Sequence, residues 1–153
     1  MIYYCDSSAV VKIYLEEAGS GYVKKLCREA PSGNVLVNAI AGPEVLSALH
    51  RRSRSGDLSP EVLSQARRDF IEDYHDFFNR VPVSDPIITL AMQLIEKHPL
   101  RGYDSVQLAS ALLLQTILRA LNGEEVHFVG SDKVLNHAAT SEGLTVINPT
   151  EQD

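Results

Sequence analysis

The first residues of the chain form a pattern that restricts the fold, because a short strand-like run ends directly at an acid and a helix follows. Ile2 to Cys5 is rich in residues that favour β-structure, Asp6 comes next, and the apolar spacing from Ala9 to Leu15 predicts a helix. A carboxylate at the carboxyl end of a parallel strand lies where open α/β sheets bind ligands. Taken alone, the pattern favours a simpler role, in which Asp6 or Ser7 caps the helix.

Strand-like and helical segments alternate along the rest of the chain. A second helix through residues 22–30 leads to a β-rich run from Val35 to Ile40, so that a helical crossover joins the first two strands and predicts parallel pairing. Arg80 to Val83 is an edge strand at best, because Pro82 has no N–H to donate to a neighbouring strand. Further helices are expected at 43–54, 61–78, 85–95, 103–114 and 133–142, and further strands at 126–129 and 144–147.

Length and composition indicate one globular unit. A chain of 153 residues that is 44% hydrophobic can bury one core, so we predict a single domain over residues 1–149 and a short tail over 150–153. No apolar run is long enough to span a bilayer and the start of the chain lacks the features of a signal peptide, which favours a cytoplasmic protein. The two cysteines and five histidines fall into no disulfide framework or metal-binding motif. A net charge of −6 argues against a surface that binds nucleic acid everywhere, but permits a local basic stripe.

Four acids share the same local context, at a strand end or in the first turn of a helix: Asp6, Glu44, Asp104 and Asp132. Each alone is explained by the helix dipole, which favours an acid there by about 0.3–1 kcal/mol. In a right-handed α/β sheet, however, the strand ends before Asp6, Glu44 and Asp132 open on one edge, and Asp104 joins them if its helix packs there. Carboxylates that meet would repel one another, so a divalent cation is expected, and oxygen ligands without His or Cys favour Mg²⁺ or Mn²⁺.

Such an ion would make the site hydrolytic. One or two of them can lower the pKa of a bound water and direct it at a phosphodiester. Ser7 is placed either to orient a carboxylate or a water through its hydroxyl, or to cap the helix.

Four segments of the chain, in this order, resemble the PIN-domain family and, within it, the VapC-type toxin ribonucleases of bacterial toxin–antitoxin pairs: 4–12, 43–49, 100–111 and 128–135. The resemblance implies a three-layer α/β/α sandwich around a mainly parallel sheet, with the four acids as the Mg²⁺ or Mn²⁺ site of an endoribonuclease. It also implies a homodimer held inactive by a small antitoxin, for which the apolar faces of 9–15 and 61–78 are suited, although core packing explains the same residues. Two positions depart from the family. Gly130 stands where Ser or Thr is frequent, which displaces the hydroxyl to Ser131, and Gln107 stands where many relatives have His.

Candidate RNA contacts are the basic residues near the predicted acidic edge: Lys12, Arg51, Arg52, Arg54, Arg101 and Lys133. A solvated charged face explains the cluster at 51–54 equally well. No aromatic stacking platform is evident, so recognition is expected to rest on RNA shape and phosphate contacts.

Two alternatives remain open from the sequence. One is a non-catalytic RNA- or protein-binding module with the same fold. The other is a different metal-dependent phosphoryl hydrolase, although the D-x-D-x-[TV] start of one common phosphatase class is absent, since Ser7 and Ser8 follow Asp6.

Overall fold

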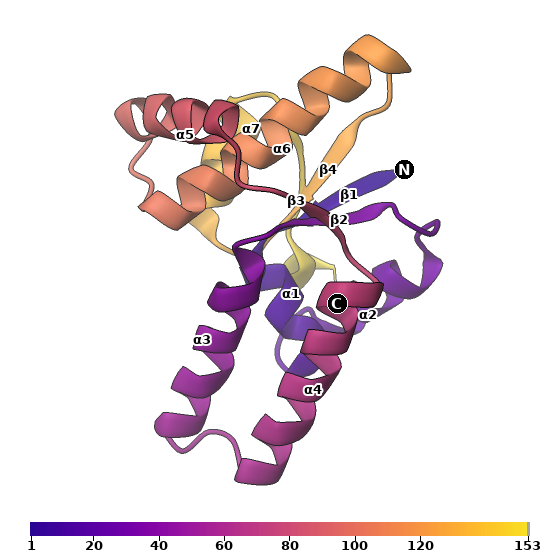
Figure 1. The fold of residues 1–153 in the computed structure, drawn as a ribbon, viewed down its shortest axis with the longest axis vertical. Coiled ribbons are helices and arrows are strands. Elements are labelled where there is room, and N and C mark those ends of the chain that lie inside the picture. Colours follow the sequence, from indigo (N-terminus) through magenta and orange to yellow (C-terminus); the bar gives the residue numbers. More distant parts are fainter. Residues whose placement is uncertain (153) are drawn as a thin grey trace.

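A parallel sheet lies between two layers of helices in the computed structural model, which describes residues 1–152 (Figure 1). The strand order is β3-β2-β1-β4-β5, and every neighbouring pair is parallel. The predicted three-layer α/β/α sandwich is therefore confirmed. The five strands are β1 (Ile2–Cys5), β2 (Val35–Asn38), β3 (Asn79–Val81), β4 (Val126–Val129) and β5 (Thr145–Ile147).

The helices divide between the two faces of the sheet. The first layer holds α1 (Ser7–Tyr14), α2 (Ser20–Glu29), α3 (Ala41–Arg54) and α4 (Pro60–Asp76), and the second holds α5 (Asp85–Lys97), α6 (Gly102–Leu121) and α7 (Lys133–Ser141). Successive side chains of a strand point to opposite faces, so Tyr4 and Phe128 belong to the α5–α7 core while Cys5 and Val129 belong to the α1–α4 core. Figure 1 shows α3 and α4 as an antiparallel pair that extends away from the sheet.

The register of the central strands places two acid-bearing segments side by side. Cys5 pairs with Val129 at the ends of β1 and β4, and the backbone N–H of Asp6 donates to the carbonyl oxygen of Val129 at 3.0 Å. The chain therefore leaves both strands at the same point of the sheet edge. Asp6 and Asp132 then begin α1 and α7 as their N-caps.

Two details were not predicted from the sequence. β2 ends at Asn38, two residues earlier than expected, and a short 3₁₀ helix, η1 (Pro149–Glu151), spans the predicted boundary between domain and tail. Pro149 is buried and lies against Gly19, where a Cβ would be 2.8 Å from the Pro149 carbonyl carbon. Asp153, the last residue of the predicted tail, lies outside the described residues.

Two further predictions concern single elements. β3 lies at the edge of the sheet and stops before Pro82, as the missing N–H requires. Among residues 1–152, none of the helices has the length and apolar character needed to cross a membrane.

Candidate active site

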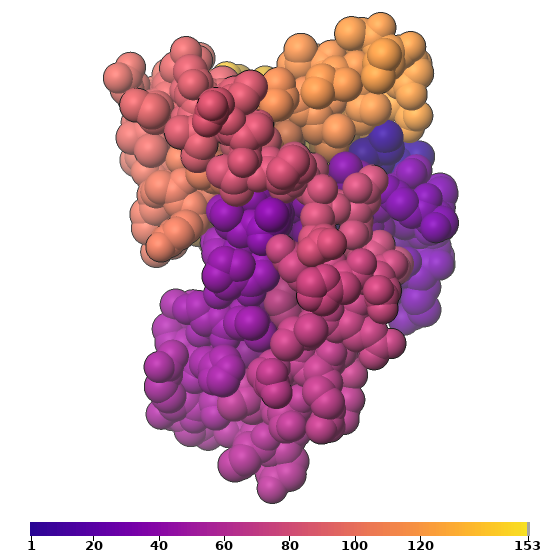
Figure 2. Space-filling view, viewed as in Figure 1, coloured from indigo at the N-terminus to yellow at the C-terminus, as the bar shows by residue number. Residues whose placement is uncertain are grey.

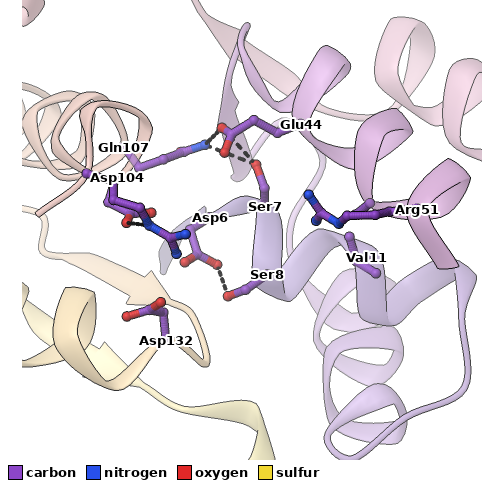
Figure 3. Close-up of a pocket in the computed structure, with 11 residues that line it drawn as sticks. Asp6, Ser7, Ser8, Val11, Glu44, Arg51, Asp104, Gln107 and Asp132 are labelled. Atoms are coloured by element: carbon purple, nitrogen blue, oxygen red, sulfur yellow. Dashed lines mark hydrogen bonds and ion pairs between the residues drawn. The ribbon is translucent and has the colours of Figure 1, made fainter. Parts of the chain in front are cut away.

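All four predicted acids line one cavity of about 210 Å³ at the carboxyl edge of the sheet (Figure 3). Asp6 follows β1, Asp132 follows β4, and Glu44 and Asp104 lie in the first turns of α3 and α6. Asp104 therefore joins the other three because α6 begins at this edge. Segments far apart in the sequence thus place their carboxylates around one space, as expected from the topology.

Asp6 is the most deeply buried of these acids, with 3% of its surface exposed. Its Oδ1 accepts hydrogen bonds from Ser8 Oγ at 2.5 Å and from the Ala9 N–H at 3.0 Å. Burial raises the pKa of Asp6 to about 7, against the lowering effect of these two bonds, and the charges of Asp104 and Glu44 raise it further. Asp6 therefore caps α1 and also presents a carboxylate that lacks a compensating positive charge.

Glu44 is held by a chain of hydrogen bonds that starts in the core. Its Oε1 accepts from Ser7 Oγ at 3.1 Å and from Gln107 Nε2 at 2.8 Å, and Gln107 Oε1 accepts from the buried Tyr4 hydroxyl at 2.6 Å. Burial raises the pKa of Glu44, and the bonds from Gln107 and Ser7 oppose that rise. Ser7 thus orients a carboxylate of the cavity, while the cap position belongs to Asp6. Gln107, at the place of the family's frequent His, links this carboxylate to the sheet.

Asp104 and Asp132 are less buried than Asp6. Burial raises the pKa of Asp104, and the charge of Asp132 raises it further. Arg101 opposes both effects, since its Nε lies 3.4 Å from Asp104 Oδ2. Asp132 Oδ1 accepts the Leu135 N–H at 2.9 Å, which fixes this side chain at the start of α7.

Glycine at position 130 keeps space open for Asp6. A Cβ built there would lie 2.8 Å from Asp6 Oδ2 and 3.1 Å from Asn136 Oδ1. Asn136 donates to the Gly130 carbonyl oxygen at 2.7 Å, and its buried Oδ1 accepts no hydrogen bond from the described part of the chain. A serine or threonine side chain, frequent at this position in the family, would displace Asp6 as it lies here.

Ser131 contacts the site through its backbone N–H and not through its predicted hydroxyl. Its N–H donates to Ser8 Oγ at 3.0 Å, and the same Ser8 hydroxyl donates to Asp6. Ser8 and Asn136 were not among the predicted site residues. Ser8 could have been predicted from its nearness to Asp6 in the sequence, whereas no sequence pattern indicated Asn136.

The donor set suits a hard divalent cation. Within residues 1–152, no three His, Cys, Asp or Glu side chains are grouped closely enough to hold a metal ion as they stand. The acids nevertheless surround one cavity without a His or Cys among its lining residues, and burial and mutual repulsion raise the pKa of three of them. Carboxylate oxygens without nitrogen or sulfur ligands beside them fit Mg²⁺ or Mn²⁺.

The predicted basic residues separate into three groups. Arg51 and Arg101 line the acidic cavity, whereas Lys12 and Arg52 pair with Glu17, at 2.9 Å and 3.1 Å. Only 7% of the Lys12 side chain is exposed, so the predicted RNA contact at Lys12 is not supported, because its ammonium is used inside the protein. Arg54 and Lys133 are exposed but line neither the acidic cavity nor the hollow beside it.

The apolar faces considered for an antitoxin contact are largely used in the core. Ala9, Val10, Val11 and Leu15 are buried in the α1–α4 core, as is Phe70 of α4. Core packing thus accounts for most of these side chains.

The sequence model of the PIN domain matches residues 3–128, which includes three of the four acids and leaves out Asp132. The chain belongs to the PIN-domain family. This PIN domain is 37% identical, over 109 residues, to the curated protein "Ribonuclease VapC45" of Mycobacterium tuberculosis, an alignment that covers 71% of this chain and 74% of that protein.

Two solved structures share the fold. FitAcB from Neisseria gonorrhoeae matches with a TM-score of 0.69 at 13% identity, covering 97% of this PIN domain and 98% of that chain. A toxin–antitoxin complex from Klebsiella pneumoniae matches with a TM-score of 0.60 at 14% identity, covering 97% and 98%. At such identities, the likeness concerns the fold alone.

Proposed function

We propose that this PIN domain is a Mg²⁺- or Mn²⁺-dependent endoribonuclease, the toxin of a toxin–antitoxin pair, which hydrolyses RNA phosphodiester bonds. The observation that carries the proposal is the gathering of four carboxylates from distant segments around one cavity. The similarity to a protein named as a ribonuclease supports RNA as the substrate.

Some residues of the site would bind the ion, and others hold the carboxylates in position. Asp6, Glu44, Asp104 and Asp132 would hold the ion, which when bound polarises the scissile phosphate and an attacking water. Ser8 and the Ala9 N–H fix the Asp6 carboxylate, as Ser7 and Gln107 fix that of Glu44. Preset orientation of this kind reduces the reorganisation needed when substrate and ion bind. Arg51 and Arg101 line the same cavity and would balance phosphate charge.

The test is RNA cleavage with Mg²⁺ or Mn²⁺, with chelator, and by charge-removing variants. We expect Asp6→Asn and Asp104→Asn to fold, by circular dichroism and thermal unfolding, but to lose cleavage. Asp85→Asn is the matched control, because Asp85 is an exposed acid in the first turn of α5 and lies away from the cavity. Undiminished cleavage by both site variants would refute the mechanism. Turnover of small phosphate esters with no effect on RNA would favour a different phosphoryl hydrolase, and metal-independent RNA binding without cleavage would favour a non-catalytic module.

Assembly is part of the proposal. A structural neighbour is a toxin–antitoxin complex, which supports a small protein antitoxin as partner, and we also propose a homodimer and a cytoplasmic location. Light scattering of the purified protein measures the oligomeric state. Co-purification with the product of a neighbouring small reading frame tests the partner, and cell fractionation tests the location.

A further inference from the structure

A second hollow, of about 580 Å³, opens beside the acidic cavity between α3 and the start of α6. Figure 2 shows this face of the molecule hollowed between these two helices. Glu44, Arg51, Arg101 and Asp104 line both spaces, so the hollow adjoins the acidic cavity. The hollow therefore offers space for the groups next to a phosphate that reaches the acids.

Tyr103 supplies an unused aromatic ring to the hollow. It is 67% exposed and directly precedes Asp104 in α6. No described residue hydrogen-bonds to its hydroxyl or stacks on its ring, in contrast to Tyr4, Tyr14 and Tyr74, which all have ring partners. The ring is therefore free to stack on a ligand.

Two arginines, Arg51 and Arg101, line both the hollow and the acidic cavity. Arg51 makes no ion pair with the described residues, and Arg101 makes one, to Asp104, while 82% of its side chain stays exposed. The neighbouring Arg52 differs, because Glu17 and Asp57 both pair with it. Positive charge is thus left available at the two arginines that line the hollow, in a protein of net charge −6.

Apolar surface completes the hollow. Ile40 and Pro43 line it from the start of α3. A planar ring, two guanidinium groups and adjacent apolar surface match the parts of a nucleotide, since bases stack on aromatic rings and phosphates bind arginine.

We propose that the hollow holds one unpaired RNA base next to the scissile phosphate, stacked on Tyr103, with the adjoining phosphates on Arg51 and Arg101. The inference rests on the proposed function and adds the residues that would hold the base and its phosphates: Tyr103, Arg51 and Arg101. The base has to be unpaired, since a base within a duplex already stacks on its neighbours. It also differs from the expectation that recognition rests on RNA shape and phosphate contacts alone. No aromatic platform was evident in the sequence, but the fold brings the exposed Tyr103 ring to the hollow.

The test uses an RNA hairpin with an unpaired loop and the same hairpin with one base removed at each loop position in turn. We expect Tyr103→Leu to lower kcat/KM about tenfold, which corresponds to about 1.4 kcal/mol and lies within the range for base–aromatic stacking. Tyr103→Phe keeps the ring and should retain activity. Removal of one particular base should lower the wild-type rate to that of Tyr103→Leu, and should not lower the rate of Tyr103→Leu further.

The arginine contribution has its own measurement. Arg51→Ala should weaken RNA binding and reduce the slope of log affinity against log salt by about 1, as expected for one phosphate contact. Arg67→Ala is the matched control, because Arg67 is exposed on α4 and lines neither space. An equal salt slope for Arg51→Ala and wild type overturns the phosphate contact.

Binding in chelator separates the inference from the proposed function. A hairpin with 2-aminopurine at the identified loop position should lose fluorescence on binding wild type but not Tyr103→Leu. If wild type cleaves RNA and Tyr103→Leu cleaves equally well, the inference fails and the proposed function stands. If wild type never cleaves but this quenching depends on Tyr103, the nucleotide site stands and the nuclease proposal fails. If Tyr103→Leu weakens only antitoxin binding, the hollow is a protein-binding site and the inference is overturned.

Discussion

Replacing Gln107 with leucine tests whether the core and the site share one hydrogen-bond chain. Gln107 is 1% exposed, donates to Glu44 and Ser7, and accepts from the Tyr4 hydroxyl. Leucine fills a similar volume but loses the bond to the Glu44 carboxylate, worth about 1.5–3 kcal/mol, and removes an acceptor from a buried hydroxyl, which costs about 1–3 kcal/mol. We therefore expect a loss of about 3 kcal/mol in the free energy of unfolding, or about 6–12 °C in the melting temperature.

The assay is urea unfolding of wild type, Gln107→Leu, Tyr4→Phe and the double variant. Because Tyr4→Phe removes the hydroxyl that Gln107→Leu deprives of its Gln107 acceptor, the two substitutions should couple by about 1 kcal/mol. Gln65→Leu is the matched control, since Gln65 is exposed on α4 and bonds only to exposed side chains. Stability of Gln107→Leu within about 0.5 kcal/mol of wild type, or strict additivity with Tyr4→Phe, would refute the reasoning.

Three further substitutions test the burial of Asp6 and the close contacts of two glycines. Burial raises the pKa of Asp6 from 3.8 to about 7. Between these two pH values, the native state therefore keeps a proton on Asp6 that the unfolded chain has released. Stability of the metal-free protein should then fall, by about 4 kcal/mol, as pH rises from about 4 to about 7. Asp6→Asn should reduce that fall, measured as urea midpoints. Gly130→Ala should cost about 1–3 kcal/mol and lower RNA cleavage, because its Cβ meets the Asp6 carboxylate. Gly19→Ala should lower the melting temperature more than Gly33→Ala, because φ is positive at both positions but only Gly19 lies against Pro149; equal losses would contradict this contact.

The sequence contained enough information to place the acids, because their positions follow from topology. Asp6, Glu44 and Asp132 each follow a parallel strand, and right-handed crossovers bring such ends to one edge. The prediction for Asp104 was conditional, because this acid reaches the others only if α6 begins at the same edge of the sheet. Their role as metal ligands stays a prediction, to be tested by cleavage and by the variants at Asp6 and Asp104.

Side-chain partners were less predictable than element positions. Lys12 looked available on a helix that leads from the acidic edge, yet the packing of α1 against α3 brings it to Glu17 beside Arg52. Tyr103 looked like one more helical residue, and only the position of α3 shows that its ring borders a hollow. Contacts of this kind depend on the distance between helices, which hydrophobic periodicity does not specify.

The order of the acids along the chain has a consequence for synthesis. Asp132 is made after the other three acids, and β4, which positions it, pairs with β1, the first strand of the chain. A nascent polypeptide therefore carries three of the carboxylates long before the fourth is in place. Premature termination upstream of β4 would release a fragment without a complete cavity, so the site can assemble only after β4 and the residues that follow it have been made.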